Sequence, residues 1–164
     1  MGSLSCANDV NLDPDIEAKR KALSLHNRYR NKHKVKNLKI SEELCEKAKK
    51  KISKLMKKND DEFIDDEDEE EELGENLYIS YKGLVDVERI LKDWYDEKNK
   101  YDFNKNKYQK GTGHFTQMIW KDTKEIGFGW DTSENNKFYF LAYYYPAGNE
   151  IGKFKENVLV EEKN

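Results

Sequence analysis

The segment spanning residues 113–120 constrains the fold of this chain more than any other stretch. Phe115, Met118 and Ile119 recur at positions i, i+3 and i+4, a spacing typical of a short buried helical turn and not of a strand. His114 opens this apolar run directly after a glycine, which leaves room for something to approach the imidazole. Two interpretations stay open: a histidine that faces a cavity, or a core histidine that is hydrogen-bonded to the backbone.

The composition indicates a single folded domain. A chain of 164 residues can bury a core of its own. Charged residues make up 38%, yet aromatic residues reach 12%, more than disordered chains carry, so the apolar side chains are few but large. The net charge of −3, without interleaved arginines and aromatic residues, argues against a nucleic-acid-binding protein.

The cysteine count bears on the compartment in which the protein folds. Cys6 and Cys45 are the two cysteines and supply no disulfide framework, which favours a reducing, intracellular compartment. No window resembles a signal peptide or a membrane-spanning helix. We expect secretion only if residues 1–3 replace a removed signal peptide.

Three segments show the spacing of amphipathic helices. The first begins with Asp13 as its N-cap and Pro14 as its first helical residue, the second begins at Ser41, and the third covers approximately residues 84–101. The inward faces of the first two helices are expected to consist of Ala18, Ala22, Leu25 and Tyr29, and of Leu44, Ala48, Ile52 and Leu55.

Glu97 stands out in the third helix because its spacing places a carboxylate inside the apolar stripe formed by Ile90, Trp94 and Tyr101. A carboxylate in such a place costs several kcal/mol unless it is paired, protonated or bound to a cation. A structural ion pair, or a position at the exposed edge of the stripe, is the alternative.

Two apolar runs over residues 125–131 and 138–145 are separated by the turn-forming residues 132–136 and predict a β-hairpin. Three helices followed by an antiparallel pair indicate a layered α+β domain. We expect a flexible leader over residues 1–12, one domain over 13–160 and a tail over 161–164. The acidic run 60–72 is interpreted as a flexible loop within that domain, because it lacks the ligand spacing of a calcium-binding loop.

Four stretches in order resemble the signatures of the CAP superfamily, also called SCP/TAPS: residues 26–30, 74–77, 113–120 and 139–149. The resemblance implies a three-layer α-β-α sandwich with a central antiparallel sheet between helices. Secreted members carry a cysteine where this chain has Ala142. The chain therefore resembles the non-secreted, Golgi-associated plant pathogenesis-related and venom-allergen-like branch.

The resemblance also implies a cavity built from two histidines and two glutamates. The matching positions here are Glu75, Glu97 and His114, and no histidine lies between His33 and His114 to complete the set. We therefore expect no required cofactor and at most weak binding of a divalent cation, zinc or magnesium. His26 belongs to another signature and is assigned a structural role.

For function, the resemblance implies a non-catalytic binding protein whose partners are a lipid, a sterol or another protein, and which associates with membrane surfaces and forms homodimers. The alternative is a metal-dependent hydrolase that uses Glu75, Glu97 and His114; no HExxH motif or neighbouring nucleophile supports it. A third interpretation is a purely structural cluster of these three side chains.

The N-terminus suggests how the chain reaches a membrane. Residues 1–6 approach the myristoylation pattern, so Gly2 is a candidate for a myristoyl group and Cys6 for a palmitoyl group. Two acyl chains would suffice for stable attachment, which predicts a cytoplasmic or peripheral, Golgi-like location. An unmodified leader or a cloning scar is the alternative.

Overall fold

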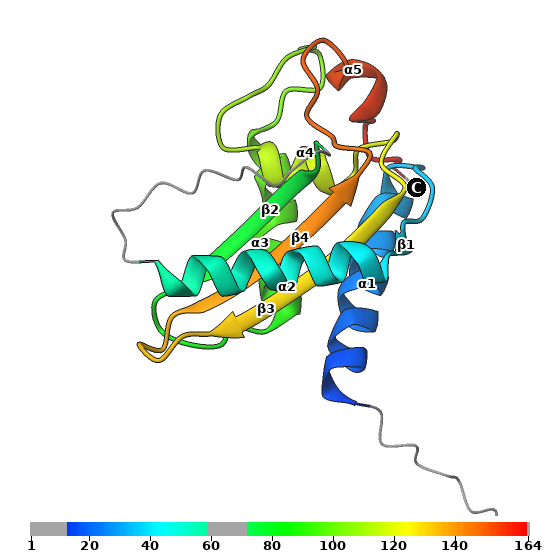
Figure 1. Ribbon diagram of the computed structural model, residues 1–164. Helices are drawn as coiled ribbons and strands as arrows, with labels where there is room; N and C mark the ends of the chain where they lie inside the picture. The colour runs from blue at the N-terminus through cyan, green and yellow to red at the C-terminus, as the bar shows by residue number, and fades with distance from the viewer. Residues whose placement is uncertain (1–12, 59–71, 164) are drawn as a thin grey trace, which may run out of the picture.

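The structure is a computed structural model, and it describes residues 13–58 and 72–163 (Figure 1). Gly2, Cys6 and nearly all of the acidic run 60–72 lie outside the described residues, so lipidation and the loop interpretation stay predictions. None of the helices in the described ranges is long and apolar enough to cross a membrane.

The described chain contains helices before, between and after the strands of one sheet. The elements are α1 (Pro14–Lys32), β1 (Lys39–Ile40), α2 (Glu42–Lys57), β2 (Gly74–Ser80), α3 (Val87–Asp96), the 3-10 helix η1 (Glu97–Lys100), α4 (Gly113–Met118), β3 (Glu125–Thr132), β4 (Phe138–Tyr145) and α5 (Phe154–Asn157).

The first two helices begin where the sequence predicts. The Asp13 carboxylate accepts a hydrogen bond from the Asp15 N–H, and the Ser41 hydroxyl accepts one from the Leu44 N–H. The third helix is shorter than expected from its apolar spacing. It begins after Asp86, whose carboxylate caps the Glu88 N–H, and it tightens into η1 from Glu97 onward instead of continuing to residue 101.

The central sheet has the strand order β1-β3-β4-β2. The predicted hairpin is confirmed as β3 and β4, which pair antiparallel with Phe128 opposite Ala142. β2 pairs antiparallel with β4 on its other side, with Gly74 opposite Tyr144. The two-residue β1 pairs parallel with β3, so the sheet departs from the expected antiparallel pattern at this edge. Neither β2 nor β1 was predicted as a strand.

The sheet lies between two helical layers, so the three-layer α-β-α sandwich is confirmed. α2 crosses one face, and α1, α3 and α4 lie on the other (Figure 1). Side chains alternate along β4 accordingly. Those packed towards α1, α3 and α4 are Phe138, Phe140, Ala142 and Tyr144, and those packed towards α2 are Tyr139, Leu141 and Tyr143.

Two glycines in β3 allow α2 to lie directly on the sheet. A Cβ atom on Gly127 would come within 2.4 Å of the backbone of Leu44 and Cys45, and one on Gly129 would come within 2.8 Å of the backbone at Ala48. Because both glycines face α2, the helix backbone approaches the strand more closely than any side chain would permit.

The segment after β4 packs against the rest of the domain and includes the short helix α5. Phe154 and Val158 join the main core with 0% and 3% exposure. The chain end then runs back along α1: the His33 Nδ1–H donates to the Leu159 carbonyl at 2.7 Å, and the Glu162 N–H donates to the Lys32 carbonyl at 3.0 Å. The i, i+4 spacing of Phe154 and Val158 is the local signal of this packing.

Candidate functional site

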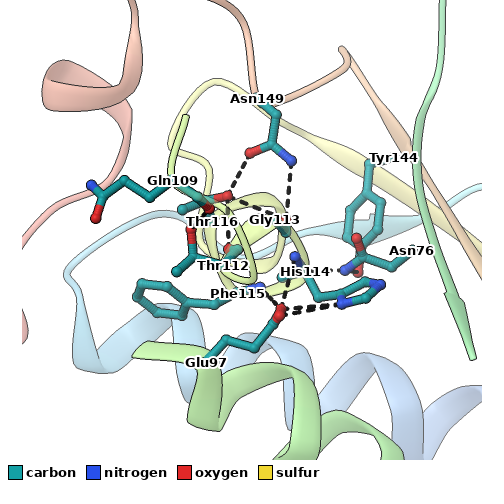
Figure 2. A network of polar contacts seen from close by, with 10 residues as sticks. All are labelled: Asn76, Glu97, Gln109, Thr112, Gly113, His114, Phe115, Thr116, Tyr144 and Asn149. Carbon is teal, nitrogen blue, oxygen red and sulfur yellow. Dashed lines mark hydrogen bonds and ion pairs between the residues drawn. The ribbon is translucent and has the colours of Figure 1, made fainter. Parts of the chain in front are cut away.

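Glu97 lies at the N-terminus of α4 and accepts hydrogen bonds from its first turn (Figure 2). Its Oε1 atom accepts the His114 N–H at 3.0 Å and the Phe115 N–H at 3.3 Å. Helix N-termini leave N–H groups without partners and carry partial positive charge, so a carboxylate is stabilised there. Among the alternatives left open for Glu97, the structure shows pairing.

The His114 imidazole turns back onto the same carboxylate. Its Nδ1 atom lies 3.1 Å from Oε1 and 3.3 Å from Oε2 of Glu97. Its ring stacks on Trp94 with centroids 5.4 Å apart and planes 13° from parallel. The His114 side chain is 42% exposed and the Glu97 side chain 15%. His114 is therefore a partly exposed histidine held by an acid and an indole.

A buried chain of hydrogen bonds ties α4 to the sheet and to α1. The Asn76 side-chain amide donates to the His114 carbonyl and to the Tyr144 hydroxyl, each at 3.1 Å. His26 Nδ1 lies 2.9 Å from the Ala22 carbonyl, which can only accept, so His26 Nε2 is the acceptor for the Tyr144 hydroxyl at 2.7 Å.

Burial decides the protonation states of His26 and Tyr144 in this hydrogen-bonded network. Loss of hydration lowers the pKa of His26 to about 3 and raises the pKa of Tyr144 above its usual range. Both groups are therefore neutral at physiological pH, and the structural role expected for His26 agrees with its place between α1 and β4.

The segment after β4 also holds α4, through contacts along the length of the helix. The Asn149 amide donates to the Gly113 carbonyl at 3.0 Å, and its Oδ1 atom contacts the Thr116 hydroxyl (Figure 2). Gln117 accepts the Gly148 N–H at 2.9 Å. Sequence reasoning did not assign roles to Asn76, Thr116 or Asn149, although each lies inside one of the four signature stretches.

Glu75 is placed differently from the other two expected site residues. Its neighbour Asn76 points to α4, and alternate residues of a strand face opposite ways, so Glu75 faces the α2 side. Its cross-strand partner Tyr143 packs in the α2 cluster, in agreement. The structure thus brings Glu97 and His114 together but does not add Glu75 to them.

The residues at this site do not fit a zinc ion. A catalytic zinc needs about three protein ligands. In residues 13–58 and 72–163, no three His, Cys, Asp or Glu side chains gather closely enough to hold a metal. The Oε1 atom of Glu97 is already engaged by two backbone N–H groups and the ring of His114. The contacts of Glu97 instead orient the N-terminus of α4 and the ring of His114.

An apolar groove lies elsewhere, between the N-terminal half of α1 and the segment that leads into α3. Its volume is about 280 Å³. The groove is lined by Ala18, Val85, Val87, Trp130, Phe138 and Phe140, with Glu17, Lys21, Leu84 and Asp86 among the residues at its edge. Trp130 stacks on Phe140 at 6.1 Å, which gives the groove an aromatic floor.

Comparison with known sequences assigns most of the chain to one protein family. Residues 23–145 match the sequence profile of CAP, the cysteine-rich secretory protein family. The chain belongs to the CAP family. Golgi-associated plant pathogenesis-related protein 1 of Homo sapiens is 35% identical over 144 residues, which cover 86% of this chain and 92% of that protein. Protein PRY2 of Saccharomyces cerevisiae is 38% identical over 89 residues, 52% of this chain and 25% of that protein.

Solved structures of CAP type share the architecture. The structure of NaASP2 with Zn2+ superposes with a TM-score of 0.70 at 23% identity and covers 94% of this chain and 90% of that chain. Venom allergen-like protein 4 of Schistosoma mansoni gives a TM-score of 0.63 at 23% identity, covering 90% of this chain and 96% of that chain. At this identity the likeness concerns the fold alone.

Proposed function

We propose that this CAP protein is a non-catalytic module that binds the acyl chain of a lipid in the groove between α1 and α3. The observation that carries the proposal is the aromatic floor of the groove, formed by Trp130 and Phe140, together with the apolar walls above it. Ligand sites are typically concave and mostly apolar, with few polar groups at the edge.

The edge of the groove supports a lipid with a small polar head. Lys21 Nζ lies 3.3 Å from Asp86 Oδ1 and 3.7 Å from Glu88 Oε2. These side chains are largely exposed, and exposed ion pairs contribute little, so Lys21 can exchange its partner for the carboxylate of a fatty acid. Burial of about ten methylene groups would contribute about 8 kcal/mol of transfer free energy, from which the entropic cost of association is subtracted.

The alternative of a metal-dependent hydrolase has less support. Glu97 and His114 form a pair with no third metal-binding side chain among the described residues. Cys45, the cysteine among the described residues, is buried on the face of α2 that packs against β3, and its Sγ atom accepts the Phe128 N–H. The polar network around α4 is thus accounted for by packing the helix onto the sheet.

Intrinsic fluorescence tests the proposal, because Trp130 is in the floor of the groove while Trp94 and Trp120 are buried in the core. Titration with palmitic acid is expected to shift the emission saturably, and Trp130→Phe should abolish that signal. Ala18→Phe should fill the groove and prevent binding, whereas Ala18→Ser should preserve it. Equal affinity in the Phe and Ser variants would contradict the proposal, and displacement of palmitic acid by cholesterol would identify a sterol as the occupant.

A further inference from the structure

A second and larger cavity, of about 840 Å³, opens at the opposite end of the sheet. Three segments form its walls: residues 34–39 after α1, residues 121–125 before and into β3, and residues 145–146 at the end of β4. Five of the side chains in these walls are lysines, namely Lys34, Lys36, Lys39, Lys121 and Lys124.

The charges of this lysine cavity are largely uncompensated. Lys34 pairs with Glu162, but within residues 13–58 and 72–163 the other four lysines have no acidic partner. Asp122 and Glu125 are the two carboxylates in the walls. Since the whole chain carries a net charge of −3, this excess of cations is a local feature and does not follow from composition.

The walls are held together by hydrogen bonds among all three segments. The Lys39 N–H donates to the Lys124 carbonyl at 3.0 Å, and the Lys124 N–H donates to the Tyr145 carbonyl at 2.9 Å. The Thr123 hydroxyl donates to the Pro146 carbonyl at 2.8 Å. The lysines therefore project from a pre-formed frame, which lowers the conformational cost of binding.

A buried cation lies directly behind these walls. Arg30 is 0% exposed and donates to the carbonyls of Lys36 at 2.7 Å, Trp120 at 2.9 Å and Thr123 at 3.1 Å. Its fourth acceptor is the Met118 carbonyl, and none of its partners is a carboxylate. Burial lowers the pKa of Arg30 to about 10, so the guanidinium stays charged at neutral pH and adds to the positive field of the cavity.

We propose that the lysine cavity binds a ligand that carries several phosphate groups, which pair with Lys36, Lys121 and Lys124. Lysines act as point charges for phosphate oxygens, and several of them converging on one cavity match a polyanion better than a single carboxylate. Soluble polyphosphates and phosphorylated lipid headgroups share this chemistry.

The lysine cavity is separate from the apolar groove between α1 and α3 that is proposed to bind an acyl chain. β3 begins at Glu125 in the cavity wall and reaches the groove floor at Trp130, which places the two sites roughly 17 Å apart along the strand. Failure of one proposal therefore leaves the other unaffected.

Calorimetric titration of the full chain with inorganic tripolyphosphate tests the proposal. The triple variant Lys36→Gln, Lys121→Gln, Lys124→Gln should weaken binding at least about tenfold, because charged hydrogen bonds are lost. A control with the same change in net charge, Lys50→Gln, Lys57→Gln, Lys107→Gln, should retain the wild-type affinity. These control lysines are exposed on α2 and on the segment after η1.

Vesicle sedimentation separates the two sources of phosphate. Phosphatidylcholine vesicles that contain phosphatidylinositol bisphosphate, whose headgroup carries several phosphates, are compared with phosphatidylcholine vesicles alone, for the wild type and both triple variants. Cavity-dependent binding to the phosphatidylinositol bisphosphate vesicles alone identifies a headgroup ligand, and cavity-dependent binding to tripolyphosphate alone identifies a soluble one. Absence of saturable binding to both probes, or equal weakening by the two triple variants, would overturn the proposal.

Discussion

At the scale of single residues, Glu97 illustrates how a partly buried carboxylate can be structural. It accepts two backbone N–H groups at the start of α4 and contacts the ring that follows them. A helix of six residues has little stability of its own, so a cap supplied from another segment matters more here than in a long helix.

Glu97→Ala is expected to lower the free energy of unfolding by roughly 1–3 kcal/mol, because it leaves two N–H groups of α4 without an acceptor. Glu97→Gln should lose less, since its amide oxygen can still accept. Urea denaturation measures both. The control Glu43→Ala removes a 76%-exposed carboxylate paired with Lys47 and should change stability by less than about 0.5 kcal/mol. Equal losses in the two Ala variants would contradict the capping role.

His26 makes stability depend on pH. Burial holds its folded-state pKa at about 3, below the ordinary value of 6.5. The unfolded chain therefore binds the extra proton first, so this stabilisation is complete above pH 6.5 and is lost as pH falls towards 3. The loss amounts to roughly 3–5 kcal/mol over that window. Burial lowers the pKa of His33 as well, which acts in the same direction.

Denaturation midpoints of wild type and His26→Gln, compared from neutral to acid pH, test this contribution. Gln can donate to the Ala22 carbonyl and accept from Tyr144 without titrating, so the variant should lose less stability on acidification. Carboxylates titrate in both proteins and cancel in the difference. Parallel pH profiles would show that His26 does not carry the effect.

At the scale of elements, contact between α2 and β3 depends on the absence of side chains. Gly127→Ala is expected to destabilise the fold by roughly 3 kcal/mol, because the new methyl group meets helix backbone that cannot move aside. Gly129→Ala should be milder, since its closest approach is 2.8 Å against 2.4 Å. Thermal denaturation of both variants gives the order, and the reverse order would contradict this packing.

At the scale of the whole molecule, Arg30 joins α1 both to the nearby Lys36 carbonyl and to residues 118–123, which are distant in sequence. Arg30→Met should lower the free energy of unfolding by more than roughly 3 kcal/mol, because four carbonyl groups lose their donor. Arg30→Lys should recover only part of this, since an ammonium group cannot reproduce the planar fork. Guanidinium denaturation checks both values. The exposed Arg28→Met on the same helix should remain within about 0.5 kcal/mol of wild type.

The sequence by itself determined the features that depend on neighbouring residues. The caps at Asp13 and Ser41, the helical turn at residues 113–118 and the strands β3 and β4 follow from local spacing, capping and turn residues. The order of the signature stretches further indicated the CAP architecture. The caps, the helical turn and the hairpin are each contained within about twenty residues of chain, and the signature order is read along the sequence, so no tertiary contact was needed to recognise them.

Only the tertiary structure decided what depends on distant partners. β2 has mixed burial and becomes a strand because β4 offers its free edge, and that register turns Asn76 towards α4 and Glu75 away from it. The sequence left open whether Glu97 pairs with a cation; in the structure its carboxylate accepts the N–H groups at the start of α4. The register between two strands decides which face of the sheet each side chain takes, and the neighbouring elements decide which group pairs with a carboxylate. Both depend on residues far apart in the chain, which sequence spacing does not reveal.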